Sequence, residues 1–219
     1  SVNDYKQFAN TFYSWTRDFS SVVYDGTHSD KRSDLITYQS YNEFSRGINS
    51  IPSSDANYTD NYKHIRRTNL LLQNAEAYAK PEDIKQYIGE AYFFRAYSYF
   101  DLLQLYGDVI ITKKPLDITD PEMKVKRNDR SEVVDLIIDD LNHAVENLPA
   151  FKELTTEEEG RISKEGAQAF LSRVALYEGT WQKSRNGNQN TQRSANLLDI
   201  AAKAARTVID AKYGYTFRL

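Results

Sequence analysis

The side chains that most often bind metal ions are few and widely spaced in this chain. The three histidines, His28, His64 and His143, have neither a second histidine nor a paired carboxylate at metal-ligand spacing. Cysteine is absent, which excludes disulfides, thiolate metal sites and a cysteine nucleophile. We therefore expect no metal ion and no cofactor.

One segment partly resembles a calcium-binding loop. Asp55, Asn57 and Thr59 alternate as the oxygen ligands do at the start of such a loop. Asp60 then stands where the turn glycine belongs, and Arg66 replaces the bidentate glutamate. Because two required positions fail, we expect no calcium ion there.

The common sequence motifs of catalytic sites are also missing. The sequence contains no Gly-x-Ser-x-Gly, phosphate-binding loop or dinucleotide fingerprint. Asp139 and Asp140 are adjacent carboxylates, but the amphipathic pattern puts them on the outer face of a helix, where charge is expected for solvation. A glycoside hydrolase would need two facing carboxylates at catalytic separation. These features favour a protein that binds a ligand and does not transform it.

The aromatic content offers a binding chemistry. The chain has 16 tyrosines, and sugars bind by laying an apolar C–H face on a ring while their hydroxyls meet amide, carboxylate and guanidinium groups. Rings at helical spacing, such as Trp15, Tyr92, Tyr99 and Tyr177, are expected in the core, because burying each stabilises by roughly 1.5 to 3 kcal/mol. The expected ligand-binding residues lie off these stripes: Tyr38, Tyr41, Asn42, Arg46, Asn57 and Tyr58.

Composition excludes several functional classes. The net charge of -3 removes the electrostatic case for nucleic acid, since such a binder needs a concentrated basic face. The sequence contains no stretch of about 18 apolar residues, which is the length that a helix needs to span a bilayer. With 219 residues and 40% hydrophobic content, the chain is long enough to bury a sizeable core, and we expect residues 1–219 to form one domain.

Helical periodicity covers most of the sequence. The expected helices cover about residues 4–23, 38–48, 58–78, 82–106, 130–148, 164–181 and 194–212. Asp129 with Glu132 has the spacing of a capping box, and Ser163 can cap the helix after it. The last helix is expected to bury Leu197, Leu198, Ala201, Ala205, Val208 and Ile209.

The segment from Glu90 to Asp108 is too aromatic and apolar to face water, so it predicts a central helix covered on both sides. Antiparallel helix pairs stacked in sequence bury their apolar faces only against neighbouring pairs. Small residues are expected where the helices approach closely: Ala96, Ala167, Ala169 and Ala205. The periodicity by itself predicts an all-α fold.

The residues of the central helix also resemble a signature of the SusD/RagB family, the surface glycan- or nutrient-binding lipoproteins of Bacteroidetes. The matching phrase is Glu-Ala-x-Phe-x-Arg-Ala-Tyr-x-Tyr-Phe-x-Leu from Glu90, followed by Tyr-Gly-Asp-Val at 106–109. Three further phrases agree in order, at 62–69, 130–149 and 160–177. Ile110 departs from the family, which usually has proline after Gly-Asp-Val.

This resemblance implies tetratricopeptide-like helical hairpins stacked as a short right-handed solenoid. It also implies non-catalytic capture of a glycan or other nutrient at the cell surface for a SusC-like TonB-dependent transporter of the outer membrane. Members of the family are held there by a lipid anchor and are longer than this chain. The chain is therefore expected to be an amino-terminal portion that lacks the anchor. Starch, host glycan, plant polysaccharide and peptide all stay open as ligands.

Two alternatives to glycan capture also stay open. The protein could be a tetratricopeptide-like adaptor that recognises a protein segment in its concave groove, or a receptor for nutrient peptides. Such a groove would show polar and basic side chains at inner helix positions, for example Arg66, Asn69 and Asn142.

Overall fold

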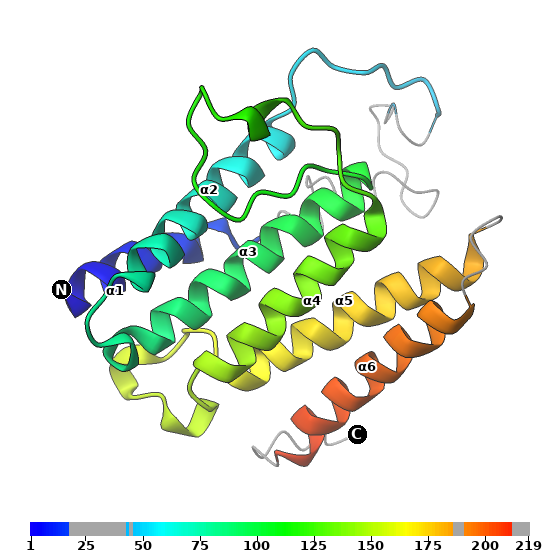
Figure 1. The fold of residues 1–219 in the computed structure, drawn as a ribbon. Helices are drawn as coiled ribbons and strands as arrows, with labels where there is room; N and C mark the ends of the chain where they lie inside the picture. Colours follow the sequence, from blue (N-terminus) through cyan, green and yellow to red (C-terminus); the bar gives the residue numbers. More distant parts are fainter. Residues whose placement is uncertain (18–42, 44–45, 186–190, 212–219) are drawn as a thin grey trace.

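The protein is a stack of antiparallel helices, seen in a computed structural model that describes residues 1–17, 43, 46–185 and 191–211. The long helices are α2 (Ala56–Glu76), α3 (Lys85–Tyr106), α4 (Arg130–Asn147), α5 (Lys164–Ser184) and α6 (Thr191–Asp210). Each packs against the next along the chain, so the hairpins form a layered array (Figure 1). This confirms the expected all-α stack of helical hairpins. Within the described part of the chain, no helix is long and apolar enough to cross a membrane.

The first helical segment is shorter than its periodicity predicts. Helix α1 (Val2–Asn10) gives way to the 3₁₀ segment η1 (Thr11–Trp15), so the expected continuation of the helix is wrong up to residue 17. The rest of the expected helix, to residue 23, lies outside the described residues. The hydroxyl of Thr11 donates to the Phe8 carbonyl at 2.7 Å, and that of Ser14 donates to the Thr11 carbonyl at 2.8 Å. Hydroxyl side chains that bond to the backbone in this way compete with regular helix geometry.

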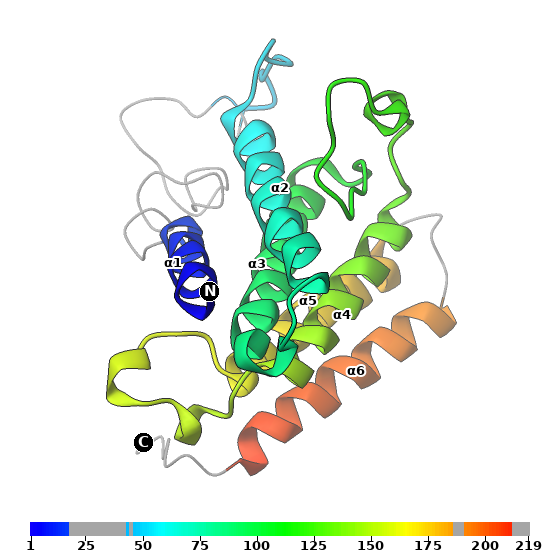
Figure 2. The same cartoon turned by 60° about the vertical axis from the view of Figure 1, so that its left-hand side comes forward.

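Helix α3 is the centre of the fold, as its composition predicts. It lies between α2 and α4, and α1 also packs against it (Figures 1 and 2). Its buried aromatic and aliphatic side chains point to both sides: Tyr87, Phe93, Phe94, Tyr99, Phe100, Leu102 and Leu103. A helix that is apolar on both faces must be covered on both, which explains why α3 has neighbours on each side.

Three buried ion pairs join the helices around α3. Arg95 of α3 donates from Nε and Nη2 to both carboxylate oxygens of Asp140 in α4, at 2.8 and 2.6 Å. Arg161, which precedes α5, binds Glu90 of α3 in the same two-fold manner, at 2.8 and 2.7 Å. The third pair links Arg130 at the start of α4 to Glu178 of α5 at 2.8 Å. The three carboxylates, Glu90, Asp140 and Glu178, are fully buried.

The placement of Asp140 corrects the expectation that both neighbouring aspartates face solvent. Asp139 is exposed, but Asp140 is 0% exposed because Arg95 meets it from the adjacent helix. Burial raises the pKa of the Asp140 carboxyl, against the opposing effect of Arg95. From an amphipathic pattern, every charged residue is predicted to face solvent. The pattern gives no sign that a charge is buried when its partner is 45 residues away in the chain.

Small residues let neighbouring helices approach closely, although not at all the expected positions. Ala96 and Ala167 are buried as predicted, whereas Ala169 is exposed and Ala205 only half-buried. The tightest approaches instead use glycine. A Cβ on Gly89 would lie 2.9 Å from Cγ of Leu148, and one on Gly179 would lie 3.0 Å from Leu198.

Among the long helices, α6 makes extensive contact only with α5. Fewer of its apolar residues are buried than predicted. Leu197, Ala201 and Ala204 are buried, but Ile209 is 66% exposed, so the expected burial of Ile209 is wrong. Beyond α5, the described contacts of α6 include the Arg193–Asp135 ion pair with α4 near the start of α6, whereas Ile209 lies at its other end.

Candidate functional site

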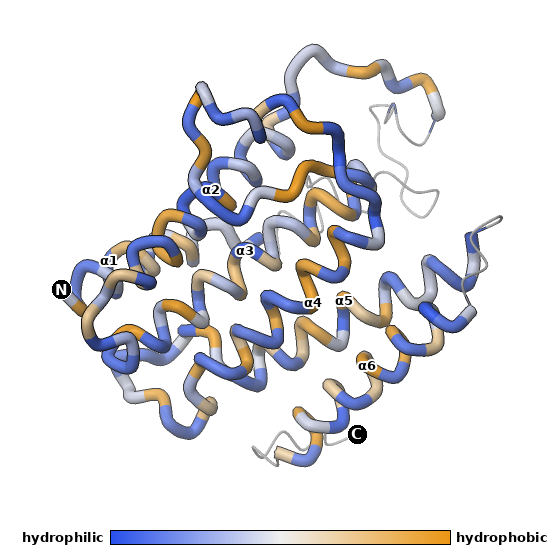
Figure 3. Tube along the Cα trace, in the orientation of Figure 1, coloured by the Kyte–Doolittle hydropathy of each residue, from blue (hydrophilic) through white to orange (hydrophobic). Residues whose placement is uncertain are grey.

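A long loop between α3 and α4 forms the most irregular described part of the molecule. It begins at Gly107, whose positive φ of 72° suits glycine and ends α3. Val109 and Asn128 then pair as an isolated antiparallel bridge, so the loop returns to the point where it left. Loops of this kind, with ends close together, frequently carry function. The segment lies over α2, and hydrophobic stretches interrupt its hydrophilic positions (Figure 3).

Side chains of α2 and α3 hold this loop by its carbonyl groups. The hydroxyl of Tyr62 donates to the Ile110 carbonyl at 2.8 Å, and Nη1 of Arg66 donates to the Leu116 carbonyl at 2.5 Å. Nδ2 of Asn69 donates to the carbonyls of Thr112 and Lys114. The hydroxyl of Tyr99 in α3 accepts a hydrogen bond from the backbone nitrogen of Thr112 at 2.8 Å. The loop is therefore positioned by residues that are 13 to 50 positions away in the sequence.

Between the loop and α2 lies a cavity of about 300 Å³, which we call the tyrosine pocket. Its lining combines two rings, two cations, one carboxylate and several apolar groups: Tyr58, Tyr62, Arg66, Ile110, Thr112, Lys114, Leu116, Glu122 and Met123. Tyr58, Tyr62 and Arg66 are four residues apart along α2, so they lie on one face of the helix. This combination of rings with charged neighbours is the pattern expected of a sugar-binding surface.

The rings of the tyrosine pocket are held by their neighbours. The ring centroids of Tyr58 and Tyr62 are 4.8 Å apart, and Tyr106 meets Tyr58 edge to face at 5.3 Å. The hydroxyl of Tyr106 donates to Oδ2 of Asp55, the residue that caps α2. Burial raises the pKa of the Tyr62 phenol above its usual range, which keeps this hydroxyl protonated as a donor to Ile110.

The predicted ligand-binding residues are divided by the structure. Tyr58 lines the tyrosine pocket. Asn57 lies one position away, but its amide donates to Oδ1 of Asp55 within the helix cap, and it is not part of the lining. Arg46 is exposed and lies in a turn. The short helix expected over 38–48 is absent at the described positions 43 and 46–48, and the rest of that range lies outside the described residues. Tyr38, Tyr41 and Asn42 lie outside the described residues.

Sequence reasoning missed most of the tyrosine pocket. The four-residue spacing of Tyr58, Tyr62 and Arg66 was a readable signal for one face of α2. Lys114 and Glu122 had no comparable signal, because a loop has no periodicity that says which way its side chains point. Asp55, Asn57 and Thr59, which open like a calcium loop, serve instead to cap α2. Among the described residues, no group of three acidic or histidine side chains is placed to hold a metal ion.

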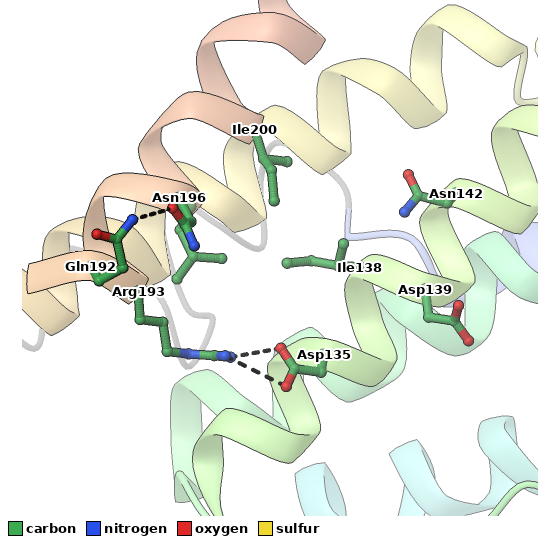
Figure 4. A pocket seen from close by; sticks show the side chains of 9 residues that line it. Asp135, Ile138, Asp139, Asn142, Gln192, Arg193, Asn196 and Ile200 are labelled. Carbon is green, nitrogen blue, oxygen red and sulfur yellow. Dashed lines mark hydrogen bonds and ion pairs between the residues drawn. The ribbon is translucent and has the colours of Figure 1, made fainter. Parts of the chain in front are cut away.

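A second cavity, of about 540 Å³, lies between α4 and α6 and is called here the α4–α6 groove. Figure 4 shows Ile138 and Ile200 pointing into it, with the amide side chains of Asn196 and Asn142 beside them. Arg193 pairs with Asp135 at 2.7 Å on one rim. Among the described residues, no aromatic ring lines this groove. It therefore lacks the stacking surface that the tyrosine pocket offers.

The polar residues expected in one adaptor groove lie in three different places. Arg66 lines the tyrosine pocket, and Asn142 lines the α4–α6 groove. Asn69 is buried, where its Oδ1 accepts a hydrogen bond from Nη1 of Arg95 at 2.8 Å. These three side chains do not form a common ligand surface.

Comparisons with known proteins agree with the fold and with the sequence resemblance. A family model described as SusD-like, "Starch-binding associating with outer membrane", matches residues 5–176. A SusD-like protein of Formosa agariphila is 33% identical over 133 residues, which make up 59% of this chain and 25% of that protein. One of Bacteroides ovatus is 29% identical over 123 residues, 56% of this chain and 20% of that protein. The chain thus spans about a quarter of the length of these relatives.

Solved structures show the same arrangement of helices. A SusD-like protein of Bacteroides fragilis superposes with a TM-score of 0.73 at 26% identity, covering 97% of this chain and 38% of that one. A structure described as a laminarin binding SusD-like protein superposes with a TM-score of 0.57 at 28% identity, covering 72% of this chain and 32% of that one.

Proposed function

This chain belongs to the SusD-like family, and from this premise we propose that it takes part in capturing a glycan at the cell surface without transforming it. The observation that carries the proposal is the tyrosine pocket. It places two tyrosine rings beside a guanidinium, an ammonium and a carboxylate in a cavity of about 300 Å³. Rings can take the apolar face of a sugar, and the charged groups can bond its hydroxyls. A laminarin binding relative supports this class of ligand.

Within this proposal, Tyr58 is the residue most directly placed to stack on a sugar. Its ring lines the cavity and is supported from behind by Tyr106. Tyr62 and Arg66 shape the same wall while they hold the loop. The other expected residues, Tyr38, Tyr41, Asn42, Arg46 and Asn57, stay predicted ligand contacts: Arg46 and Asn57 do not line the tyrosine pocket, and the first three lie outside the described residues.

The wider role follows the family. A SusC-like TonB-dependent transporter would receive the glycan, and a lipid anchor outside this chain would hold the protein on the outer-membrane surface. The proposal includes no catalytic step, no cofactor and no nucleic acid. The buried carboxylates of the described core, such as Asp140 and Glu90, each bind an arginine and are 0% exposed, which supports binding over hydrolysis.

The test is a glycan panel, measured by affinity electrophoresis and then by calorimetry. We expect the chain to bind at least one glycan with no turnover, and Tyr58→Ala to weaken that binding at least tenfold, which is about 1.4 kcal/mol. Tyr78→Ala is the matched control, because Tyr78 follows the opposite end of α2 and packs on Tyr5. Binding that is equal in both variants would remove the tyrosine pocket from the proposal.

A receptor for peptides is the second candidate, and the α4–α6 groove favours it. Three amide side chains, Asn142, Gln192 and Asn196, line an apolar floor there, and amides can bond to the main chain of an extended peptide. A peptide library screened beside the glycan panel decides between the two. Peptide binding that is lost in Asn196→Ala but retained in Tyr58→Ala would favour this candidate.

A further inference from the structure

We propose that the tyrosine pocket selects an anionic glycan, one that carries carboxylate or sulfate groups, over a neutral glycan. This inference rests on the glycan-binding function proposed above and names the class of glycan. It derives from the charged side chains that line the pocket and from the charge of the loop that covers it.

Cationic side chains outnumber acidic ones in the lining of the tyrosine pocket. In the part of the lining that the structure describes, Arg66 and Lys114 supply two cations and Glu122 supplies the one carboxylate. Lys114 and Glu122 form an ion pair at 2.9 Å, with side chains that are 52% and 50% exposed. Nη1 of Arg66 donates a hydrogen bond to the Leu116 carbonyl, which holds the guanidinium group at the wall of the cavity. The lining therefore has a net positive charge.

The part of the loop around the pocket is also basic. Between Val109 and Asn128, the two residues of the bridge, there are five cationic residues and three acidic ones, which gives this part of the loop a net charge of +2. The two other acidic residues of the loop, Asp108 and Asp129, bring the loop as a whole to zero, but both are engaged at the first turn of α4. The five cationic residues are all exposed: Lys113, Lys114, Lys124, Lys126 and Arg127. The whole chain has a net charge of -3, so this part of the loop is positive on a protein that is otherwise negative. A local field of this kind raises the concentration of anions near the pocket.

An anionic substituent would replace a weak internal contact with a better one. Half-exposed lysine–glutamate pairs contribute little, because water screens them and both side chains lose freedom. A ligand carboxylate or sulfate can displace the Glu122 carboxylate from Lys114, and it can accept further hydrogen bonds from Arg66. A neutral sugar makes the same ring contacts with Tyr58, but its hydroxyls accept weaker hydrogen bonds from the cations than an ionised group does. The apolar lining from Ile110 and Met123 favours a sugar ring over an inorganic anion alone.

The test compares glycans that differ only in the anionic group. Calorimetric titration of the 219-residue chain at 20 mM salt would use a β-1,4-mannohexaose against a β-1,4-mannuronate hexasaccharide, and a desulfated carrageenan hexasaccharide against the same hexasaccharide with its sulfate groups. We expect the charged member of at least one pair to bind at least tenfold more tightly. Its affinity should fall severalfold at 300 mM salt, because salt screens exposed charges. The pair that shows the preference identifies the carboxylate or the sulfate as the group recognised.

Variants in the loop give the sign of the effect. Lys114→Gln should weaken binding of the charged glycan about tenfold, whereas Glu122→Gln should strengthen it about threefold, because Lys114 is then released. Lys124→Gln is the matched control, with the same charge change on the same loop but outside the pocket lining, and should alter affinity less than twofold.

Two results would overturn the inference. Equal affinity within both pairs, unchanged by salt, would leave the chain a glycan-binding protein with no preference for charge. Failure to bind any probe, together with a negative glycan panel, would overturn the inference and the proposed function at once.

Discussion

The buried ion pairs and the tyrosine pocket use the same residue types for opposite purposes. Arg95 and Asp140 have side chains that are 6% and 0% exposed, whereas Lys114 and Glu122 are about half exposed. The first pair is enclosed between α3 and α4, and the second lies on the lining of a cavity. Charge in the first place fixes how helices meet. Charge in the second place is available to a ligand.

This difference follows from what surrounds each pair. A buried ion that loses its partner is left in a medium that solvates it poorly, so the cost of breaking the pair is large. A half-exposed ion is solvated by water once its partner leaves, so the cost is small. The pairs of the core can therefore specify the stacking of the hairpins, and those of the pocket can exchange partners without loss of the fold.

The largest expected effect comes from breaking a buried pair. Asp140→Asn should lower the free energy of unfolding by about 3 to 5 kcal/mol, because the Arg95 guanidinium stays buried without a carboxylate. Asp139→Asn, the adjacent exposed position, should change it by less than about 0.5 kcal/mol. Chemical denaturation measures both. Equal effects at the two positions would contradict the distinction between buried and exposed charge.

A smaller effect is expected from the close approach of α3 to α4. Gly89→Ala should cost about 1 to 3 kcal/mol, because the new methyl would lie 3.0 Å from the backbone nitrogen of Leu148, which cannot move easily. Gly166→Ala is the control, since its nearest neighbour is the flexible tip of Ile162. Thermal unfolding of both variants tests this. A Gly89→Ala protein as stable as the original would show that the helices can separate.

Loss of one hydrogen bond between α2 and the loop that covers it should destabilise the loop and leave the packing of the helices unchanged. Tyr62→Phe removes the hydroxyl that donates to the Ile110 carbonyl, at a cost of about 1 kcal/mol. Backbone amides of residues 110–116 should then exchange hydrogen faster, while those of α3 and α4 keep their protection. Tyr78→Phe should leave the loop unchanged. Slow exchange throughout the loop in Tyr62→Phe would show that other contacts suffice to hold it.

The smallest effect concerns pH. His64 stacks on Trp15 with centroids 4.1 Å apart, and burial lowers its pKa from the usual value, with Arg67 and Lys63 acting in the same direction and Asp60 against them. Below the usual histidine pKa the unfolded chain therefore binds more protons than the folded one, and stability falls as pH falls. The midpoint of thermal unfolding at pH 7.5 and pH 5 measures this. His64→Gln should reduce the difference, and an unchanged difference would assign it to other groups.

Local features of the sequence predicted the helices and their starts. Asp129 and Glu132 form the capping box of α4, and Ser163 caps α5 by accepting a hydrogen bond from the Gly166 nitrogen. The apolar pattern of residues 90–108 predicted a helix covered on both faces, and α3 is one. These predictions succeed because each depends on residues three or four positions apart. The same local logic selected Tyr58 as a candidate ligand contact, which stays a prediction although Tyr58 lines the tyrosine pocket.

The tertiary structure alone decided which charges are buried and where the pocket forms. Asp140 and Ile209 were both misplaced from the pattern, because a helical face is buried only if another helix meets it, and the pattern does not name that helix. Lys114 and Glu122 reach the pocket because Tyr62, Arg66 and Asn69 fix the loop from 43 to 50 residues away. Periodicity determines the faces of single helices. Contacts between distant residues determine which faces meet and which charges a ligand can reach.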